Sequence, residues 1–131
     1  PRMLQNDGRV ISNFISRALK GNLITIYGDG KQTRSFCYVD DLIDGLIKLM
    51  NSNFEMPINI GNPNELSILE LYEIIKEKIN PNLDVEFRKL PQDDPLKRKP
   101  NIEKAKLYLD WQPKTSLEKG LEITIESFKK L

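Results

Sequence analysis

Five side chains in this sequence are of the types that bind a phosphorylated ligand, and they lie near the ends of expected elements: Arg9, Tyr27, Arg34, Asn59 and Arg98. The planar guanidinium of arginine donates a fork of N–H groups that matches two phosphate oxygens. A tyrosine at the end of a strand offers a flat face to a base. Arginines converging from separate loops therefore indicate a diphosphate site, provided that the fold brings them together.

The residues that would carry out catalysis are less evident. The chain has no histidine and one cysteine, Cys37, so it offers neither a disulfide framework nor a histidine base, and we predict no metal site. Cys37 lies in an apolar run and is predicted to be a structural thiol. Tyr27/Lys31 and Tyr72/Lys76 have the spacing of a tyrosine–lysine acid–base pair. We interpret both as coincidences, because Tyr27 and Lys31 lie on either side of a glycine turn and the other pair lies on an ordinary amphipathic helix.

Length and charge exclude several classes of function. A chain of 131 residues is long enough for one domain with a core, so we predict a single unit over 1–131. The formal net charge of +1 gives no field for holding nucleic acid, and phosphate binding must therefore come from a few placed arginines. No apolar run reaches the roughly 18 residues of a membrane span. The single cysteine fits a reducing compartment.

The most informative stretch is 27–41, which reads Tyr-Gly-Asp-Gly-Lys-Gln-Thr-Arg-Ser-Phe-Cys-Tyr-Val-Asp-Asp. It begins at the end of an apolar run, turns at Gly28-Asp29-Gly30 and resumes as a short aromatic run from Phe36 to Val39. Asp40 is predicted to be the N-cap of the helix that follows. A strand, a glycine turn, an arginine and a capped helix together indicate an anion site.

The remaining elements predict a mixed α/β (α+β) fold with a small sheet and several helices. Helical spacing of apolar residues is found in 10–19, 42–50, 68–79, 102–109 and 117–128, and Ser67 and Ser116 are the expected caps of the third and last of these helices. Strands are expected at 23–27, 57–60 and 84–88. Arg9 stands at a helix start, where the macrodipole and a cation would together favour a phosphate, although a solvated surface arginine fits the sequence as well.

These motifs resemble the C-terminal, substrate-binding part of extended short-chain dehydrogenase/reductases that act on nucleotide sugars, within the NAD-dependent epimerase/dehydratase family. The resemblance runs from Pro1-Arg2-Met3 to Leu121 and includes stretch 27–41 and Asn59-Ile60-Gly61-Asn62. Pro1-Arg2-Met3, the 6–10 segment and the run 90–100 resemble most closely the branch that decarboxylates UDP-glucuronate. Stretch 27–41 alone does not separate that branch from 4,6-dehydratases or 4-epimerases.

The resemblance implies an NAD-dependent lyase that converts UDP-glucuronate to UDP-xylose and carbon dioxide. It implies that UDP-sugar is bound by residues of this chain, that Thr25 and Tyr27 flank the uracil, and that Arg34 and Arg98 grip the diphosphate and ribose. It places Asn59 beside them, Arg9 and Val10 against the nucleotide sugar or cofactor, and Arg2 near the nicotinamide.

The family's glycine fingerprint and its catalytic tyrosine–lysine pair are not found in this sequence. We therefore expect the chain to be a lobe of a longer enzyme whose NAD-binding Rossmann domain lies upstream, to contain no catalytic residue, and to be inactive alone. The resemblance implies a homodimeric, cytoplasmic parent, or a Golgi-lumenal one if an upstream anchor exists. The alternatives are a lobe of a dehydratase or epimerase and a non-catalytic α/β binding module.

Overall fold

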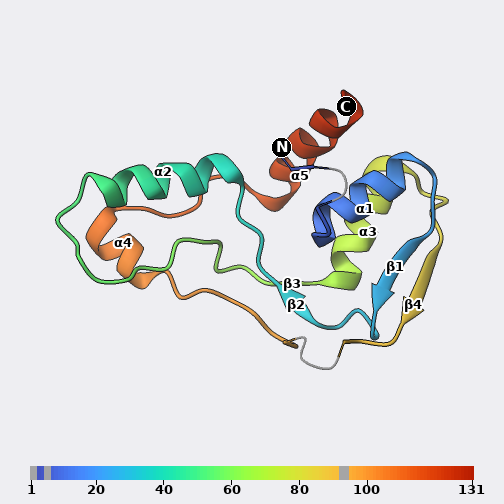
Figure 1. The fold of residues 1–131 in the computed structure, drawn as a ribbon, viewed down its shortest axis with the longest axis horizontal. Coiled ribbons are helices and arrows are strands. Elements are labelled where there is room, and N and C mark those ends of the chain that lie inside the picture. The colour runs from blue at the N-terminus through green and yellow to red at the C-terminus, as the bar shows by residue number, and fades with distance from the viewer. Residues whose placement is uncertain (1–2, 5–6, 92–94) are drawn as a thin grey trace.

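The computed structural model describes residues 3–4, 7–91 and 95–131, which form five helices and four short strands (Figure 1). In chain order these are α1 (Val10–Leu19), β1 (Ile24–Tyr27), β2 (Thr33–Arg34), α2 (Val39–Met50), β3 (Leu66–Ser67), α3 (Ile68–Ile79), β4 (Val85–Arg88), α4 (Glu103–Leu109) and α5 (Leu117–Lys129). The mixed α/β class predicted from the sequence is confirmed.

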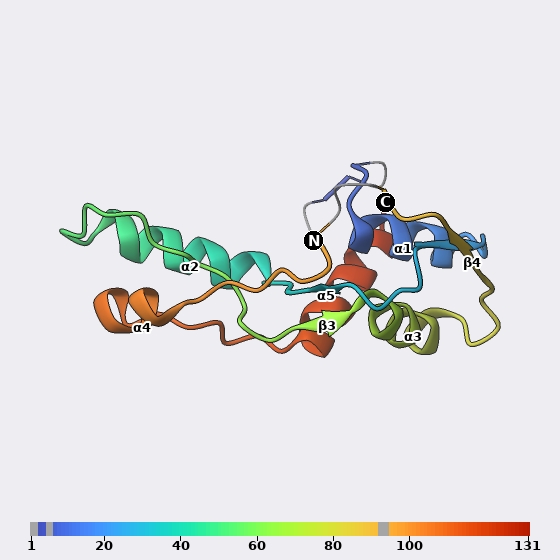
Figure 2. The ribbon, with the colours of Figure 1, turned by 90° about the horizontal axis from the view of Figure 1, so that it is seen from below.

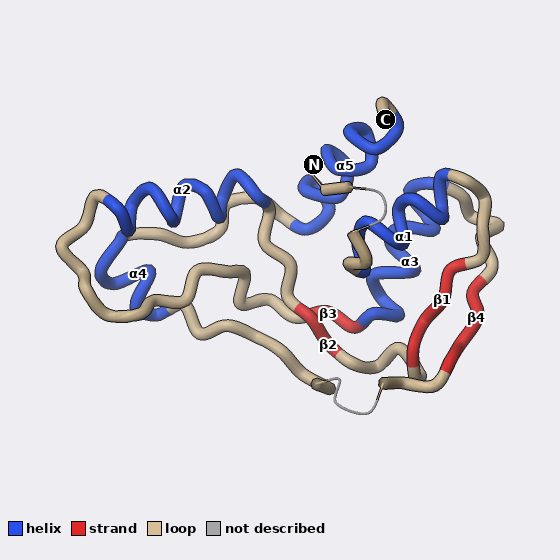
Figure 3. Tube along the Cα trace, viewed as in Figure 1, coloured by secondary structure: helices blue, strands red, loops and turns tan. Residues whose placement is uncertain are grey.

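The strands form two separate pairs, which the tube view distinguishes clearly (Figure 3). β1 pairs with β4 in parallel, with Ile24 opposite Val85 and Tyr27 opposite Arg88. β2 pairs with β3 in the antiparallel sense, with Thr33 opposite Ser67 and Arg34 opposite Leu66. The strands predicted near 23–27 and 84–88 are confirmed, whereas the two-residue strands β2 and β3 were not predicted.

The helix ends follow local chemistry. Gly21 adopts φ +70° just after α1, a left-handed conformation that glycine reaches without strain. The Ser67 hydroxyl accepts the backbone N–H of Glu70 at the start of α3, and the Ser116 hydroxyl accepts that of Lys119 at the start of α5. Both serine caps predicted from the sequence are confirmed.

Most of the buried apolar side chains form one cluster, which we call the main core. It joins α1, α3 and α5 to β1 and contains Phe14, Ile15, Ala18, Ile24, Ile26, Ile68, Leu71, Tyr72, Ile75, Leu83, Leu121, Ile125 and Phe128. A second cluster, the Trp111 cluster, contains Ile102, Ala105, Leu109 and Trp111 and lies between α4 and α2. Figures 1 and 2 both show α2 and α4 extending together away from the rest of the fold.

The predicted strand at 57–60 is wrong: these residues belong to no helix and pair with no strand in the part of the chain that the structure describes. Ile58 and Ile60 instead pack against the Trp111 cluster, which accounts for the apolar pattern that suggested a strand. A run of alternating apolar residues indicates that one side of the segment is buried. A β-strand also needs a neighbouring strand to which its backbone can hydrogen-bond.

Asp40 is not the N-cap of α2, which is a second correction. The cap position is Tyr38, and Asp40 lies exposed in the first turn, where its negative charge still suits the helix dipole. The next residue, Asp41, has the structural role. Its buried carboxylate accepts the backbone N–H groups of Lys114 (3.1 Å) and Thr115 (2.8 Å), so it ties α2 to the segment that leads into α5.

Candidate functional site

The turn after β1 is held by hydrogen bonds of Gln32 and by close packing against α3. Gly28 and Gly30 have φ values of +72° and +78°, and a Cβ at Gly30 would lie 3.0 Å from that of Leu69. The buried Gln32 side chain donates to the Tyr27 carbonyl oxygen (2.8 Å), and the Gln32 carbonyl oxygen accepts the backbone N–H of Ile68 (3.0 Å). The predicted glycine turn is confirmed, and Gln32, which the sequence analysis did not single out, holds it closed.

Tyr27, the predicted uracil neighbour, ends β1 and is 47% exposed. The backbone continues the pairing with β4 for one more residue, because the Gly28 N–H donates to the Arg88 carbonyl oxygen (2.6 Å). The ring is therefore carried on an anchored strand end and remains accessible. This position suits an aromatic contact with a ligand, and the role itself stays a prediction.

Thr25, the second predicted uracil neighbour, is buried, and its hydroxyl donates to Glu86 Oε1 (2.7 Å) across the β1–β4 pair. Arg88 lies 2.9 Å from the same carboxylate oxygen. The threonine hydroxyl and then the Arg88 cation lower the pKa of Glu86. A uracil contact of Thr25 would therefore be made by its backbone or methyl group.

Arg34 and Arg98, the predicted diphosphate ligands, lie on neighbouring segments. Arg34 Nη1 donates to the carbonyl oxygens of Thr33 (2.7 Å) and Pro95 (2.8 Å). The Ser35 hydroxyl lies 3.4 Å from the Arg98 carbonyl oxygen, to which it donates, while the Arg98 residue is exposed. We call residues 95–98 the 95–98 segment. The structure thus brings this segment next to residues 33–35.

Arg9 and Val10 occupy the start of α1. The Asp7 carboxylate accepts the Arg9 backbone N–H (3.0 Å) and the Ser12 hydroxyl, and these hydrogen bonds, that of Ser12 first, lower the pKa of Asp7. The Arg9 side chain is 77% exposed, with Nε 3.9 Å from Asp7 Oδ2. Asp7 therefore already supplies an anion beside Arg9, with which a phosphate would have to compete. Val10 packs against the main core.

The other predicted residues lie apart from this group. The exposed Asn59 donates from Nδ2 to the Asn101 carbonyl oxygen (3.3 Å), which places it beside the start of α4. Arg2 lies outside the described residues. Tyr72, the member of the Tyr-x-x-x-Lys spacing on α3, is buried in the main core and donates its hydroxyl to the Leu83 carbonyl oxygen (2.9 Å). The Tyr72 hydroxyl group therefore has a structural partner. This agrees with the interpretation of the Tyr72/Lys76 spacing as a coincidence.

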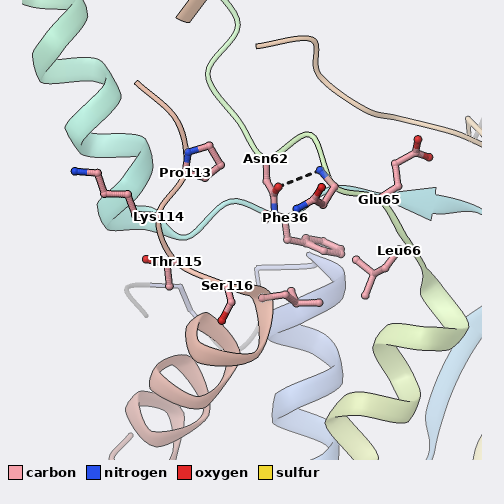
Figure 4. Close-up of a pocket in the computed structure, with 10 residues that line it drawn as sticks. Phe36, Asn62, Glu65, Leu66, Pro113, Lys114, Thr115 and Ser116 are labelled. Carbon is pink, nitrogen blue, oxygen red and sulfur yellow. Dashed lines mark hydrogen bonds between the residues drawn. The ribbon is translucent and has the colours of Figure 1, made fainter. Parts of the chain in front are cut away.

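Two cavities share a wall formed by Phe36 and residues 115–117. The first, of about 340 Å³, is lined by Asn62, Asn64, Glu65 and Leu66 on one side and by residues 113–117 on the other. Figure 4 shows Phe36 between Asn62 and the segment that begins α5. The second, of about 280 Å³, is more apolar and includes Met3, Arg9 and Cys37. Cys37 is half-buried and packs against the Trp111 cluster, and burial and then the Asp41 carboxylate raise the pKa of its thiol to about 11. The raised pKa disfavours the nucleophilic thiolate, and the structural role of Cys37 stays a prediction.

The described residues supply no metal site and no membrane span. No group of three or more histidine, cysteine, aspartate or glutamate side chains is arranged to hold a metal in residues 3–4, 7–91 and 95–131. Within the same residues, no helix combines the length and the apolar character needed to cross a bilayer.

Comparisons with known proteins show what the chain is similar to. Residues 1–61 match the profile of the NAD dependent epimerase/dehydratase family. UDP-glucuronic acid decarboxylase 2 of Arabidopsis thaliana is 51% identical over 98% of this chain, and UDP-glucuronic acid decarboxylase 1 of Xenopus tropicalis is 52% identical over 99%. The chain spans 29% and 31% of these two relatives.

Solved structures are also similar to this chain. UDP-glucose 4-epimerase from Thermotoga maritima, solved with UDP-glucose, superposes with a TM-score of 0.95 at 31% identity, over 99% of this chain and 42% of its own. UDP-glucuronic acid 4-epimerase from Bacillus cereus, in complex with UDP-glucuronic acid and NAD, gives a TM-score of 0.90 at 29% identity, over 99% of this chain and 42% of its own. The resemblance predicted from the sequence is confirmed: over nearly its whole length, the chain is similar to part of the UDP-glucuronic acid decarboxylases.

Proposed function

We propose that this chain is the nucleotide-sugar-binding lobe of an NAD-dependent UDP-glucuronate decarboxylase, which forms UDP-xylose and carbon dioxide. One observation favours a decarboxylase over a 4,6-dehydratase or a 4-epimerase. Identity to the decarboxylases is 51–52% over nearly the whole chain, whereas identity to the two 4-epimerases described above is 29–31%. The epimerases share the fold, and the decarboxylases share more of the sequence as well.

The geometry supports binding of UDP-sugar at the end of β1. Tyr27 is accessible on an anchored strand, and two arginines are carried by segments that contact each other beyond the glycine turn. With a net charge near zero, such local arginines are the means by which the chain would attract a diphosphate. On this basis we assign ligand roles to Tyr27, Arg34 and Arg98, whereas the roles of Arg9 and Asn59 rest on the resemblance alone.

NAD would be bound mainly outside this chain. Gly28 and Gly30 connect β1 to β2 and no helix follows them directly, so the turn lacks the strand-to-helix geometry of a dinucleotide site. When bound to the whole enzyme, NAD would accept and return a hydride. This chain would bind the nucleotide sugar, and the resemblance implies that Arg2 and Arg9 are its residues closest to the cofactor. The predicted homodimer and cytoplasmic location belong to the same proposal.

The test is product analysis with the full-length enzyme. UDP-glucuronate and NAD should give UDP-xylose and carbon dioxide, detected by NMR and by release of labelled carbon dioxide from the C6 carboxylate. Formation of UDP-galacturonate would instead favour a 4-epimerase. Binding of UDP-glucuronate with no turnover would favour the non-catalytic module. The 131-residue chain assayed alone should form no UDP-xylose, because Tyr72 is buried in the main core and a glycine turn separates Tyr27 from Lys31.

A further inference from the structure

The peptide group that joins Tyr27 to Gly28 is hydrogen-bonded on both edges of β1. On one edge, the Gly28 N–H donates to the carbonyl oxygen of Arg88 in β4 (2.6 Å). The N–H and C=O of a trans peptide point in opposite directions, so the Tyr27 carbonyl group faces away from β4. There it accepts an N–H of the Gln32 side-chain amide at 2.8 Å. A side chain thus takes the place of a neighbouring strand on this edge of β1.

Gln32 is itself firmly anchored. It is 6% exposed, and its carbonyl oxygen accepts the backbone N–H of Ile68 (3.0 Å) at the start of α3. Two residues earlier, the Gly30 carbonyl oxygen accepts the N–H of Leu69 (3.0 Å). Ile68 belongs to the main core, so the Gln32 amide is carried by backbone that the core holds in place. The Gln32 side chain therefore links the end of β1 to the first turn of α3.

The turn that Gln32 closes contains two glycines. The four residues between Tyr27 and Gln32 include Gly28 and Gly30, with φ values of +72° and +78°. Glycine loses more conformational freedom on ordering than any other residue, so such a turn is costly to hold in one conformation. The hydrogen bond from Gln32 to the Tyr27 carbonyl oxygen joins the two ends of the turn and opposes this cost. We therefore expect the end of β1 to loosen when the Gln32 amide is removed.

The two residues that this hydrogen bond joins differ in exposure. Tyr27 is 47% exposed, whereas the buried Gln32 has little surface with which to contact a ligand. A ring that is fixed before the ligand arrives binds more tightly, because less ordering has to accompany binding. Tyr27 thus offers the contact surface, and Gln32 fixes the backbone from which the Tyr27 ring projects.

We propose that Gln32 is a positioning residue: it holds the end of β1 so that the Tyr27 ring is presented to the base of the nucleotide sugar. This assignment rests on the proposed function and extends it to a buried side chain that does not contact the ligand. A residue that acts through Tyr27 loses its effect on binding once the Tyr27 ring is removed. A residue that affects the site by another route keeps its effect in that background.

The first test is a double-mutant cycle in the full-length enzyme. Gln32→Met keeps the length of the side chain but removes its donor, so it should raise the KM for UDP-glucuronate about fivefold with kcat within about twofold. Tyr27→Ala should raise the KM about tenfold, and the double variant should have a KM no higher than that of Tyr27→Ala. Multiplicative losses in the double variant, or an unchanged KM in Gln32→Met, would overturn the proposal. Gln32→Glu, which keeps the shape of the side chain, serves if Gln32→Met fails to fold, and its effect should also vanish in the Tyr27→Ala background.

The second test measures the turn itself. Hydrogen exchange at the amides of residues 28–31 of the full-length enzyme, measured by mass spectrometry, should be about tenfold faster in Gln32→Met. Arg17→Met is the matched control, because Arg17 Nη1 also donates to a backbone carbonyl oxygen, that of Leu23 (3.1 Å), just before the other end of β1. The control should leave exchange at 28–31 and the KM unchanged. Unchanged exchange in Gln32→Met would overturn the positioning role even if the enzyme is a decarboxylase. A wild-type enzyme that binds no UDP-sugar would overturn the proposed function and, with it, the ligand assigned here to Tyr27.

Discussion

The two packed regions of this molecule differ in how completely they enclose their apolar residues. The main core is surrounded by α1, α3, α5 and β1, so each helix buries its apolar face against another element. The Trp111 cluster has four buried residues, with α4 on one side and α2 on the other. Apolar area removed from water sets the largest favourable term in folding, so the two regions should differ in local stability.

α2 shows the difference most directly. Its inner side buries Asp41 and Gly45, while Ile43, Leu46, Ile47 and Met50 are 36–81% exposed. The apolar stripe predicted from the sequence exists, but it is not the side that packs in this chain. Helical periodicity identifies a stripe, and the neighbouring elements decide which side of the helix is covered.

The strongest test of this contrast is Trp111→Ala. Trp111 is 1% exposed and its Nε1 donates to the Asp41 carbonyl oxygen (2.9 Å). Removing the indole should cost about 3–5 kcal/mol of stability, from lost burial and a cavity. Hydrogen exchange should increase much more at the amides of α2 and α4 than at those of α1 and α3. Equal loss of protection in all four helices would show that the two regions unfold as one unit.

Gly45→Ala should have the next largest effect, and its sign is the informative part. Alanine normally stabilises a helix relative to glycine by up to about 1 kcal/mol. Here a Cβ at Gly45 would lie 2.7 Å from Ile60 Cγ2 and 3.1 Å from two atoms of the Trp111 ring. Overpacking should therefore destabilise the chain by about 1–3 kcal/mol in urea unfolding. A gain in stability would mean that α2 and the Trp111 cluster separate easily.

A smaller effect is expected from the thiol beside α2. Because the pKa of Cys37 is raised to about 11 from an ordinary 9.0, the folded state favours the neutral thiol. The resulting stability is present below pH 9 and is lost as the pH rises through about 11. Urea midpoints should fall over this interval more in the wild type than in Cys37→Ala, with both curves parallel between pH 7 and 8. Identical curves above pH 9 would contradict the burial of this thiol.

The smallest effect should come from the outer side of α2. Ile47 is 51% exposed, so Ile47→Lys should change the stability of this chain by no more than about 0.5 kcal/mol. Leu49→Lys is the matched control on the same helix, because Leu49 packs against the Trp111 cluster and its replacement by a cation should be clearly destabilising. A comparable loss from both substitutions would show that the outer side is covered.

The sequence was sufficient for elements that carry their own signals. Ser67 and Ser116 cap their helices through a local side-chain to backbone hydrogen bond, and the Gly28–Gly30 turn needs φ values that glycine supplies. Residues 57–60 and Asp40 were mispredicted because their roles depend on distant partners. Ile58 and Ile60 pack against the Trp111 cluster, and Asp41 receives N–H groups from residues 73 and 74 positions away.

The candidate site shows the same limit. Its residue types were predicted from arginine and tyrosine chemistry and from the resemblance. The contact between Arg34 and the Pro95 carbonyl group spans 61 positions and was not predicted. Neither was the use of the Thr25 hydroxyl by Glu86, because a carboxylate opposite a threonine becomes visible only when the pairing of β1 with β4 is known. Hydrogen bonds between residues that are far apart in the chain carry little signal in a single sequence.

The parallel pairing of β1 with β4 has a consequence for the order of folding. Ile24 lies opposite Val85, so the pair closes a loop of about 60 residues, for which chain entropy costs roughly 4 kcal/mol. During synthesis, β1 emerges long before its partner, and its buried Ile24 and Ile26 must wait for α3 and β4. We expect α1 and α3 to form early and the β1–β4 pair to close late. The accessible end of β1 that carries Tyr27 would then be among the last parts of the fold to become ordered.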